Sequence, residues 1–232
     1  MPFFYYFDPT YVLIIIGVLL SLAASAKVKS TYARYSREQS LSGMTGAQAA
    51  QKILNTAGIY DVRIQHVAGN LTDHYDPRNK TLSLSDSVYG NASVAAVGVA
   101  AHECGHAIQH DRGYAPLKFR SFLVPVANFG AKISWPLILL GILFGGSQTL
   151  VQIGILCFSL AVLFQIVTLP VEFNASNRAV ALLSETGILY EDELRKTRKV
   201  LSAAALTYVA AAAASILQLL RLVLLFGNRR RD

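Results

Sequence analysis

Charged residues are scarce in this chain of 232 residues. Only 15% of them are Asp, Glu, Lys or Arg, whereas about a quarter is usual in soluble domains. Hydrophobic residues make up 53%, and the mean hydropathy is +0.40. One small domain cannot bury so much apolar surface, so the composition favours a membrane protein.

Cysteine is nearly absent, which excludes a disulfide framework. Cys104 and Cys157 are the two cysteines, and their surroundings give no reason to expect a bridge. The chain also lacks a basic stripe with interleaved aromatic residues, which argues against a nucleic-acid partner. The excess of 21 basic over 14 acidic residues is better explained by the tendency of basic residues to stay on the cytoplasmic side of membrane spans.

No lysine or arginine precedes Lys27, although the apolar run 11–26 lies close to the N-terminus. A cleaved signal peptide needs a positive segment before its apolar core, so the "ASA" at 24–26 is not expected to be a cleavage site. With the aromatic cluster 3–7 as an interfacial belt, the run predicts an uncleaved anchor whose N-terminus lies outside.

Three more apolar runs follow, at 122–144, 150–169 and 203–226. The first two are separated by a short loop, so we expect a helical hairpin. The intervening polar segments predict further elements: a helix from the Thr45 cap to Gly58, strands at 61–67 and 80–85, a long helix from about Ser93, and a helix that starts after Pro170 and stops at Gly187.

These elements predict a mostly α integral membrane protein, with transmembrane helices and a small α+β zincin-like catalytic domain. Basic residues concentrate in 27–120 and 170–200, so both segments are expected to face the cytoplasm. The tail Arg229–Arg231 contradicts this topology if the last run crosses. Either that run does not cross or three external arginines are tolerated, and the sequence leaves both open. The expected organisation is an anchor at 1–27, a cytoplasmic zincin-like segment at 28–120, a transmembrane hairpin at 121–169, a cytoplasmic helix at 170–200 and a C-terminal membrane helix at 201–232.

The stretch "VAAHECGHAIQHD" at 99–111 contains the residue types that can bind a metal ion and transfer a proton. His102 and His106 are four residues apart, so a helix presents them on one face, where they can bind one Zn²⁺ at about 2.0–2.1 Å. Glu103 lies beside them and can reach a water on the metal as general base. Gly105 permits a close approach of backbone or substrate.

A catalytic zinc site needs a third protein ligand and an open position for water. His110 lies on the same stripe, but one straight helix cannot arrange three ligands tetrahedrally, and Arg112 occupies the place of the third histidine of metzincins. Glu172 in "VEFNASNRA" is favoured, because it begins a second helix on the same side of the membrane. The alternative is that Glu172 is an interfacial carboxylate stabilised by a helix dipole.

"VAAHECGHAIQH", "LPVEFNASNRA", "DHYDPRNKTLSLS" and "AALTYVAAA" together resemble the YugP-type family of bacterial, membrane-bound neutral zinc metallopeptidases. The resemblance covers most of the chain. It implies that His102, His106 and Glu172 bind one zinc ion and that Glu103 is the catalytic base. It also implies a polypeptide substrate in or beside the lipid of a bacterial cell membrane, which the protein crosses several times.

The arrangement, in which a second helix supplies a glutamate as third ligand, is similar to that of HtpX-like and CAAX-prenyl membrane proteases. One residue departs from the HtpX-like pattern. Where an Asp would orient a zinc-binding histidine, this chain has Ser176, followed by Asn177. The orienting group is therefore Ser176, Asn177 or another residue.

The function expected from these residues is peptide-bond hydrolysis by water that zinc activates. Arg178, His74 and Tyr75 are the candidate donors to the tetrahedral oxyanion. The strand at 80–85 is a candidate edge strand that pairs with an extended substrate. The alternative function is a non-catalytic membrane scaffold that retains a zinc site, and the intact Glu103 argues against it because a structural site needs no base.

Overall fold

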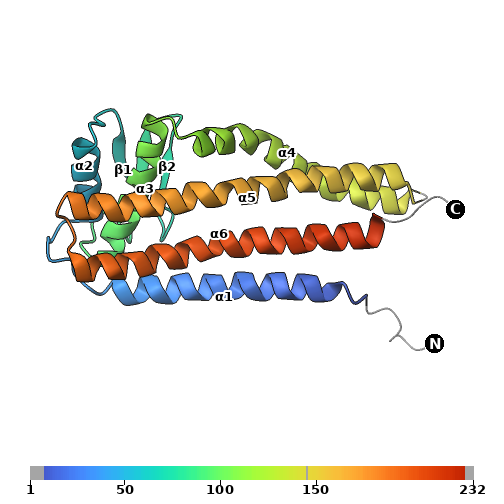
Figure 1. Ribbon diagram of the computed structural model, residues 1–232, viewed down its shortest axis with the longest axis horizontal. Helices are drawn as coiled ribbons and strands as arrows, with labels where there is room; N and C mark the ends of the chain where they lie inside the picture. The colour runs from blue at the N-terminus through green and yellow to red at the C-terminus, as the bar shows by residue number, and fades with distance from the viewer. Residues whose placement is uncertain (1–7, 145, 228–232) are drawn as a thin grey trace. The chain divides into compact units, whose positions relative to one another are not determined.

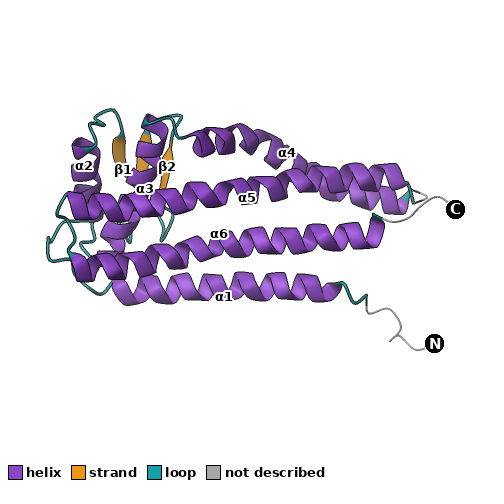
Figure 2. Ribbon diagram, viewed as in Figure 1, coloured by secondary structure: helices purple, strands orange, loops and turns teal. Residues whose placement is uncertain are grey.

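The computed structural model describes residues 8–144 and 146–227 (Figure 1). The aromatic cluster 3–7 and the tail 229–231 lie outside the described residues. In chain order the elements are α1 Tyr11–Tyr35, α2 Gly46–Thr56, β1 Arg63–Val67, β2 His74–Asp76, β3 Thr81–Ser85, α3 Val94–Asp111, α4 Ala115–Leu143, α5 Gln148–Glu185 and α6 Glu191–Phe226. Figure 2 shows how small a part of the chain the three strands make up.

The helices α1, α4, α5 and α6 are each long and apolar enough to cross a membrane. The shortest of them, α1, has 25 residues, whereas about 20 are needed at 1.5 Å per residue to span the hydrocarbon core. The mostly helical class, with apolar helices and a small sheet, is thereby confirmed.

The chain divides into two compact units. Unit 1 comprises Met1–Ala24, Phe119–Leu169 and Thr207–Asp232, and unit 2 comprises Ser25–Lys118 and Pro170–Leu206. Contacts within a chain do not test on which side of a membrane a segment lies. The organisation into five segments therefore stays a prediction.

Small residues let the helices of unit 1 pack closely. A Cβ atom added to Gly130 on α4 would lie 2.6 Å from the carbonyl oxygen of Cys157 on α5, and one added to Gly154 on α5 would lie 2.9 Å from that of Ser134. Such contacts between backbones are typical of helices that associate in lipid. They confirm the predicted hairpin of α4 and α5.

The prediction that Pro170 begins a new helix is wrong. Helix α5 runs without a break from Gln148 to Glu185, with Pro170 inside it. Proline leaves the carbonyl of Ile166 without its helical donor, but it does not force a break where neighbouring packing holds the helix. The residues that follow are held in this way, since Val171 and Ala175 are fully buried.

In unit 2, a three-stranded sheet has the order β1-β3-β2, with β1 parallel and β2 antiparallel to β3. The predicted strands at 61–67 and 80–85 are present as β1 and β3. The prediction that the second of them is an edge strand is wrong, because β3 lies in the centre and all five of its residues are buried. The sequence did not reveal β2, a strand of three residues that occupies one edge.

The local signals for the helices of unit 2 are confirmed. The Thr45 side chain accepts a hydrogen bond from the Gln48 amide at the start of α2, and the backbone reaches φ +78° at Gly58 just beyond its end. Ser93 caps α3. Helix α3 packs against α2, β2 and β3, around a core that includes Ile53, Leu54, Leu82, Leu84 and Ile108.

Candidate metal centre

Helix α3 holds the two histidines of the motif. The Ser93 hydroxyl accepts a hydrogen bond from the Ala96 amide and fixes the first turn, and the alanines that follow favour helix. Four residues make slightly more than one turn, so His102 and His106 project from the same face. Their ring centroids are 4.7 Å apart, with the ring planes nearly perpendicular.

Glu172 meets these histidines from α5. One of its carboxylate oxygens, Oε2, lies 3.3 Å from Nε2 of His102 and 3.6 Å from Nε2 of His106. The side chain of Glu172 is almost completely buried. The structure thus brings together the three residues that the sequence singles out as ligands, and one donor atom from each lies within 4.8 Å of the others.

This donor set fits a zinc ion. Ligands at about 2.1 Å from a tetrahedral ion lie roughly 3.4 Å from one another. Both nitrogen–oxygen distances to Glu172 are close to that value. Two imidazole nitrogens and one carboxylate are also the ligand types of catalytic zinc sites that keep a position open. His102, His106 and Glu172 could therefore hold one metal ion.

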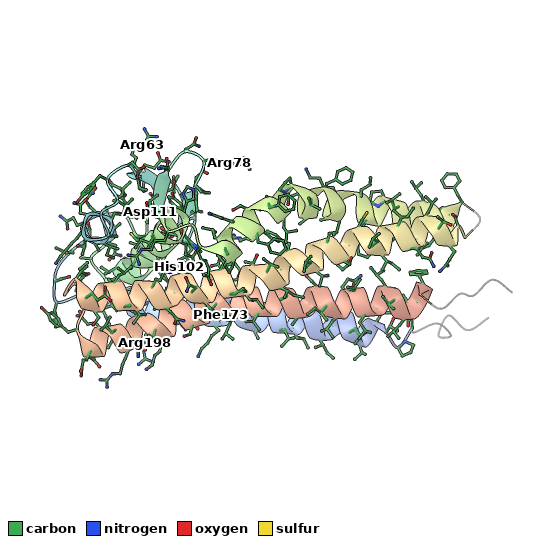
Figure 3. The ribbon with its side chains drawn as sticks, turned by 45° about the horizontal axis from the view of Figure 1, so that its top comes forward. Arg63, Arg78, His102, Asp111, Phe173 and Arg198 are labelled. Atoms are coloured by element: carbon green, nitrogen blue, oxygen red, sulfur yellow. The ribbon has the colours of Figure 1, made fainter. Side chains whose placement is uncertain are left out.

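A glycine brings the two helices close enough for this arrangement. A Cβ atom added to Gly105 on α3 would lie 2.6 Å from the carbonyl oxygen of Ala175 on α5. Because real Cβ atoms do not approach an oxygen so closely, only glycine fits between the helices. The sequence predicts a close approach at Gly105, and the approaching group is the backbone of α5. Figure 3 labels His102 on α3 and Phe173, the neighbour of Glu172, on α5.

Charge in the cluster favours an ionised carboxylate. Burial alone would raise the pKa of Glu172, but the ring nitrogens of His102 and His106 that face its carboxylate hold that pKa well below its usual range. Burial alone would likewise lower the pKa of His106, yet the hydrogen bond to Glu172 and the charge of Glu103 raise it. A metal ion would bind the neutral imidazoles, so metal affinity at this site depends on pH.

The second nitrogen of each histidine has a partner that orients the ring. The Ser176 hydroxyl lies 3.2 Å from Nδ1 of His102. Oε1 of Gln109 lies 3.0 Å from Nδ1 of His106. Of the groups that the sequence left open for this role, Ser176 is thus the one placed beside His102. Such partners fix ring orientation in metal sites.

Sequence reasoning did not find Gln109. This residue is fully buried, and its amide nitrogen donates to the carbonyl of Val171 at 2.9 Å and to Oδ1 of Asn174 at 3.0 Å. It therefore joins His106 to the backbone of α5. Its position three residues after His106 could have indicated this role, because residues at that spacing are neighbours on a helix.

Glu103 lies between the two histidines in the chain and is 8% exposed. Within residues 8–144 and 146–227, its carboxylate has no hydrogen bond or ion pair. Its charge nevertheless acts on the neighbouring His106, whose pKa it raises. A carboxylate in this position is able to accept a proton from water.

The other candidates lie in different surroundings. Nδ1 of His110 is 2.9 Å from the hydroxyl of Tyr75, and burial is the main cause that raises the pKa of Tyr75 to about 12. Nδ1 of His74 lies 2.9 Å from the carbonyl of Thr72. Arg178 differs, because its Nε donates to Oδ1 of Asn174 at 2.8 Å and so joins the network of Gln109.

Comparison with known proteins identifies the family of the chain. The model of a family described as "Putative neutral zinc metallopeptidase" matches residues 10–227. The chain belongs to this family. It is 48% identical over 213 residues to the "Putative membrane protease YugP" of Bacillus subtilis (strain 168), which covers 92% of this chain and 94% of that protein. Among solved structures, none matches the chain.

Proposed function

We propose that the protein is a multi-pass membrane zinc endopeptidase that hydrolyses polypeptides in or beside the bacterial membrane. His102, His106 and Glu172 are the metal ligands and Glu103 is the general base. One observation carries the proposal: the three donor atoms converge within 4.8 Å, next to a glutamate whose charge acts on His106. The family and the name of the relative support the same reaction class.

A zinc ion at this site would supply a Lewis acid and lower the pKa of water to about 7. Glu103 accepts the proton of the attacking water and delivers it to the leaving amine. Gln109 and Ser176 keep the two imidazole rings in place during this proton transfer. Of the three candidate donors to the oxyanion, Arg178 is favoured because Asn174 and Gln109 connect it with His106.

The order of the strands limits where an extended substrate can pair with the sheet. Because β3 is central, an extended peptide can add to this sheet only beside β1 or β2. Helix α3 contacts β2 directly. The basic residues that flank the apolar helices support a cytoplasmic position for this part of the chain, and with it the site.

Substitution of the two glutamates tests the proposal. Glu103→Gln keeps the shape of the side chain but cannot accept a proton, so it should retain zinc and lose roughly 100-fold or more of the proteolytic activity. Glu172→Gln removes an anionic ligand and should lower zinc content and activity together. Metal content by mass spectrometry and cleavage of casein and of membrane proteins are the measurements. Glu185→Gln, an exposed glutamate at the end of α5, is the matched control.

Two outcomes would overturn the proposal. Loss of metal in Glu103→Gln together with full activity in Glu172→Gln would show that the ligand and the base are assigned wrongly. Wild-type protein that holds zinc but cleaves none of these substrates, in cells that match the Glu103→Gln strain, would favour the scaffold.

A further inference from the structure

A cavity of about 600 Å³ lies in unit 2, between the C-terminal part of α1 and the N-terminal part of α6. The two helices lie side by side in Figure 1. None of the residues of the candidate metal centre lines the cavity. Its lining residues are Lys27, Ser30, Thr31, Arg34, Tyr35, Lys199, Ser202, Ala203 and Leu206.

Each helix turns one regular face to the cavity. On α1 the lining residues Lys27, Ser30, Thr31 and Arg34 follow the spacing i, i+3, i+4, i+7, and on α6 the residues from Lys199 to Leu206 repeat it. Residues at this spacing form a continuous stripe along a helix. From Lys27 to Arg34 the stripe is about 10 Å long at 1.5 Å per residue.

The cavity is strongly positive. Lys27, Arg34 and Lys199 line it, and no Asp or Glu does. In the part of the chain that the structure describes, none of these three cations has a carboxylate partner. Lys196, one turn earlier on α6, is different, because it pairs with Glu38 at 2.7 Å and with Asp192 at 2.8 Å. The lining holds four hydroxyl side chains, of which that of Ser30 donates to the Lys27 carbonyl at 3.1 Å and the others add hydrogen-bond donors. The cavity therefore suits an anion with several acceptor oxygens.

The cavity also lies where both helices change from apolar to charged. The apolar run of α1 ends at Ala26, next to Lys27, and the apolar run of α6 begins at Ala203, after Lys199. In a helix that spans a membrane, this change marks the level of the lipid headgroups. A soluble anion would not need the apolar side chains of Ala203 and Leu206 in the lining, whereas a lipid has methylene groups that contact them.

We propose that this cavity binds the headgroup of an anionic phospholipid such as phosphatidylglycerol. Lys27, Arg34 and Lys199 neutralise the phosphate, and the hydroxyls of Thr31 and Ser202 donate hydrogen bonds to its oxygens. Leu206 contacts the glycerol end of the acyl chains. A choline headgroup is disfavoured, because its own positive charge would lie among three cations. This site is independent of the peptidase reaction.

The test uses the full-length protein, purified in a neutral detergent and freed of lipid. Dioctanoyl phosphatidylglycerol, dioctanoyl phosphatidylcholine and inorganic phosphate are titrated separately, and binding is followed through the melting temperature and a dissociation constant. Phosphatidylglycerol should stabilise the wild type, and the other two probes should not. The triple variant Lys27→Gln, Arg34→Gln, Lys199→Gln should bind phosphatidylglycerol roughly 100-fold more weakly, since each cation near anionic lipid contributes about a factor of five.

A matched triple variant controls for net charge. Lys29→Gln, Arg37→Gln, Arg198→Gln removes three exposed cations that do not line the cavity: Lys29 on α1, Arg37 just after its end, and Arg198 on α6, which Figure 3 labels. It should bind phosphatidylglycerol like the wild type. The zinc content of both variants reports whether they fold, and the single variants Lys27→Gln and Lys199→Gln should each show a partial loss.

Three results would overturn the proposal. Equal losses in the two triple variants would mean that surface charge, and not the cavity, attracts the lipid. Equal stabilisation by inorganic phosphate would mean that the cavity takes a soluble anion. Equal stabilisation by phosphatidylcholine would mean that the acyl chains alone are bound.

Discussion

Gln109 connects the two helices that carry the candidate ligands. It accepts from His106 on its own helix and donates to Val171 and Asn174 on α5. Since the residue is fully buried, water cannot replace any of these hydrogen bonds. One side chain thus controls both the orientation of a metal ligand and the docking of the helix that supplies another.

Gln109→Leu keeps most of the volume and removes all three hydrogen bonds. We expect zinc affinity to fall about 10–100-fold, the usual effect of losing a group that orients a ligand. The free energy of unfolding should fall by about 1–3 kcal/mol, because the buried hydrogen bonds from Gln109 to the Val171 carbonyl and to Asn174 are lost. Competition with a chelator and thermal unfolding measure the two effects.

Two further variants separate orientation from packing. Gln109→Glu still accepts from His106, so it should restore part of the zinc affinity while the stability stays low. Gln51→Leu, at an exposed amide on α2, should change neither quantity. Tight zinc binding in Gln109→Leu would contradict the role assigned to this residue.

The residues of the metal centre differ in how far the sequence predicts them. The spacing of His102 and His106 alone predicts that they share one face of a helix. The same motif predicts Glu103 as the general base. Glu172 lies on a separate helix, and its position was inferred from the side of the membrane and from the resemblance. Gln109 became visible only in the structure, because its partners are backbone and side-chain atoms 62 and 65 positions further along the chain.

At the scale of elements, the contact of α3 with α5 depends on the absence of one side chain. Gly105→Ala places a methyl group 2.6 Å from the Ala175 carbonyl oxygen, so the helices must move apart. We expect a loss of about 1–3 kcal/mol in the free energy of unfolding, as is usual for an overpacked site. Zinc affinity should fall as well, since Glu172 moves away with α5.

Gly90→Ala is the control for this prediction, because nothing lies within 4 Å of a Cβ atom at that position. Unfolding and zinc titration should be unchanged in it. If Gly105→Ala also binds zinc with the affinity of the wild type, the spacing of α3 and α5 does not set the geometry of the site.

Element boundaries were predicted where local chemistry fixes them. Ser93 and Thr45 cap helices, and Gly187 ends α5 with φ +63°. The order of the sheet and the continuity of α5 through Pro170 were not predicted correctly. Both depend on packing between distant segments, which neither propensity nor periodicity reports.

At the scale of the whole molecule, a bound metal should stabilise the fold, because it joins α3 to α5 only in the folded state. Removal of zinc with a chelator should lower the melting temperature of the wild type, by the equivalent of about 2.7 kcal/mol when zinc was present at 100 times its dissociation constant. Removal of zinc should lower the stability of the Glu103→Gln variant by the same amount, because this variant keeps the metal ligands. A chelator that leaves the melting temperature of zinc-loaded protein unchanged would contradict this expectation.

The topology gives a second prediction at this scale. A cysteine at Leu41, which is 81% exposed, should react with an impermeant maleimide only after the cells are permeabilised. A cysteine at the exposed Thr149, at the start of α5 in the hairpin, should react in intact cells. The wild type measures the background of Cys104 and Cys157. Labelling of Leu41→Cys in intact cells would reverse the orientation.

The candidate metal centre is completed late in translation. The ribosome makes α3 first, then α4 and the apolar half of α5, and only then Glu172. A nascent chain that has stalled in the hairpin possesses two histidines and a base but lacks the carboxylate. The enzyme that we propose is therefore inactive until both apolar helices of the hairpin have been synthesised.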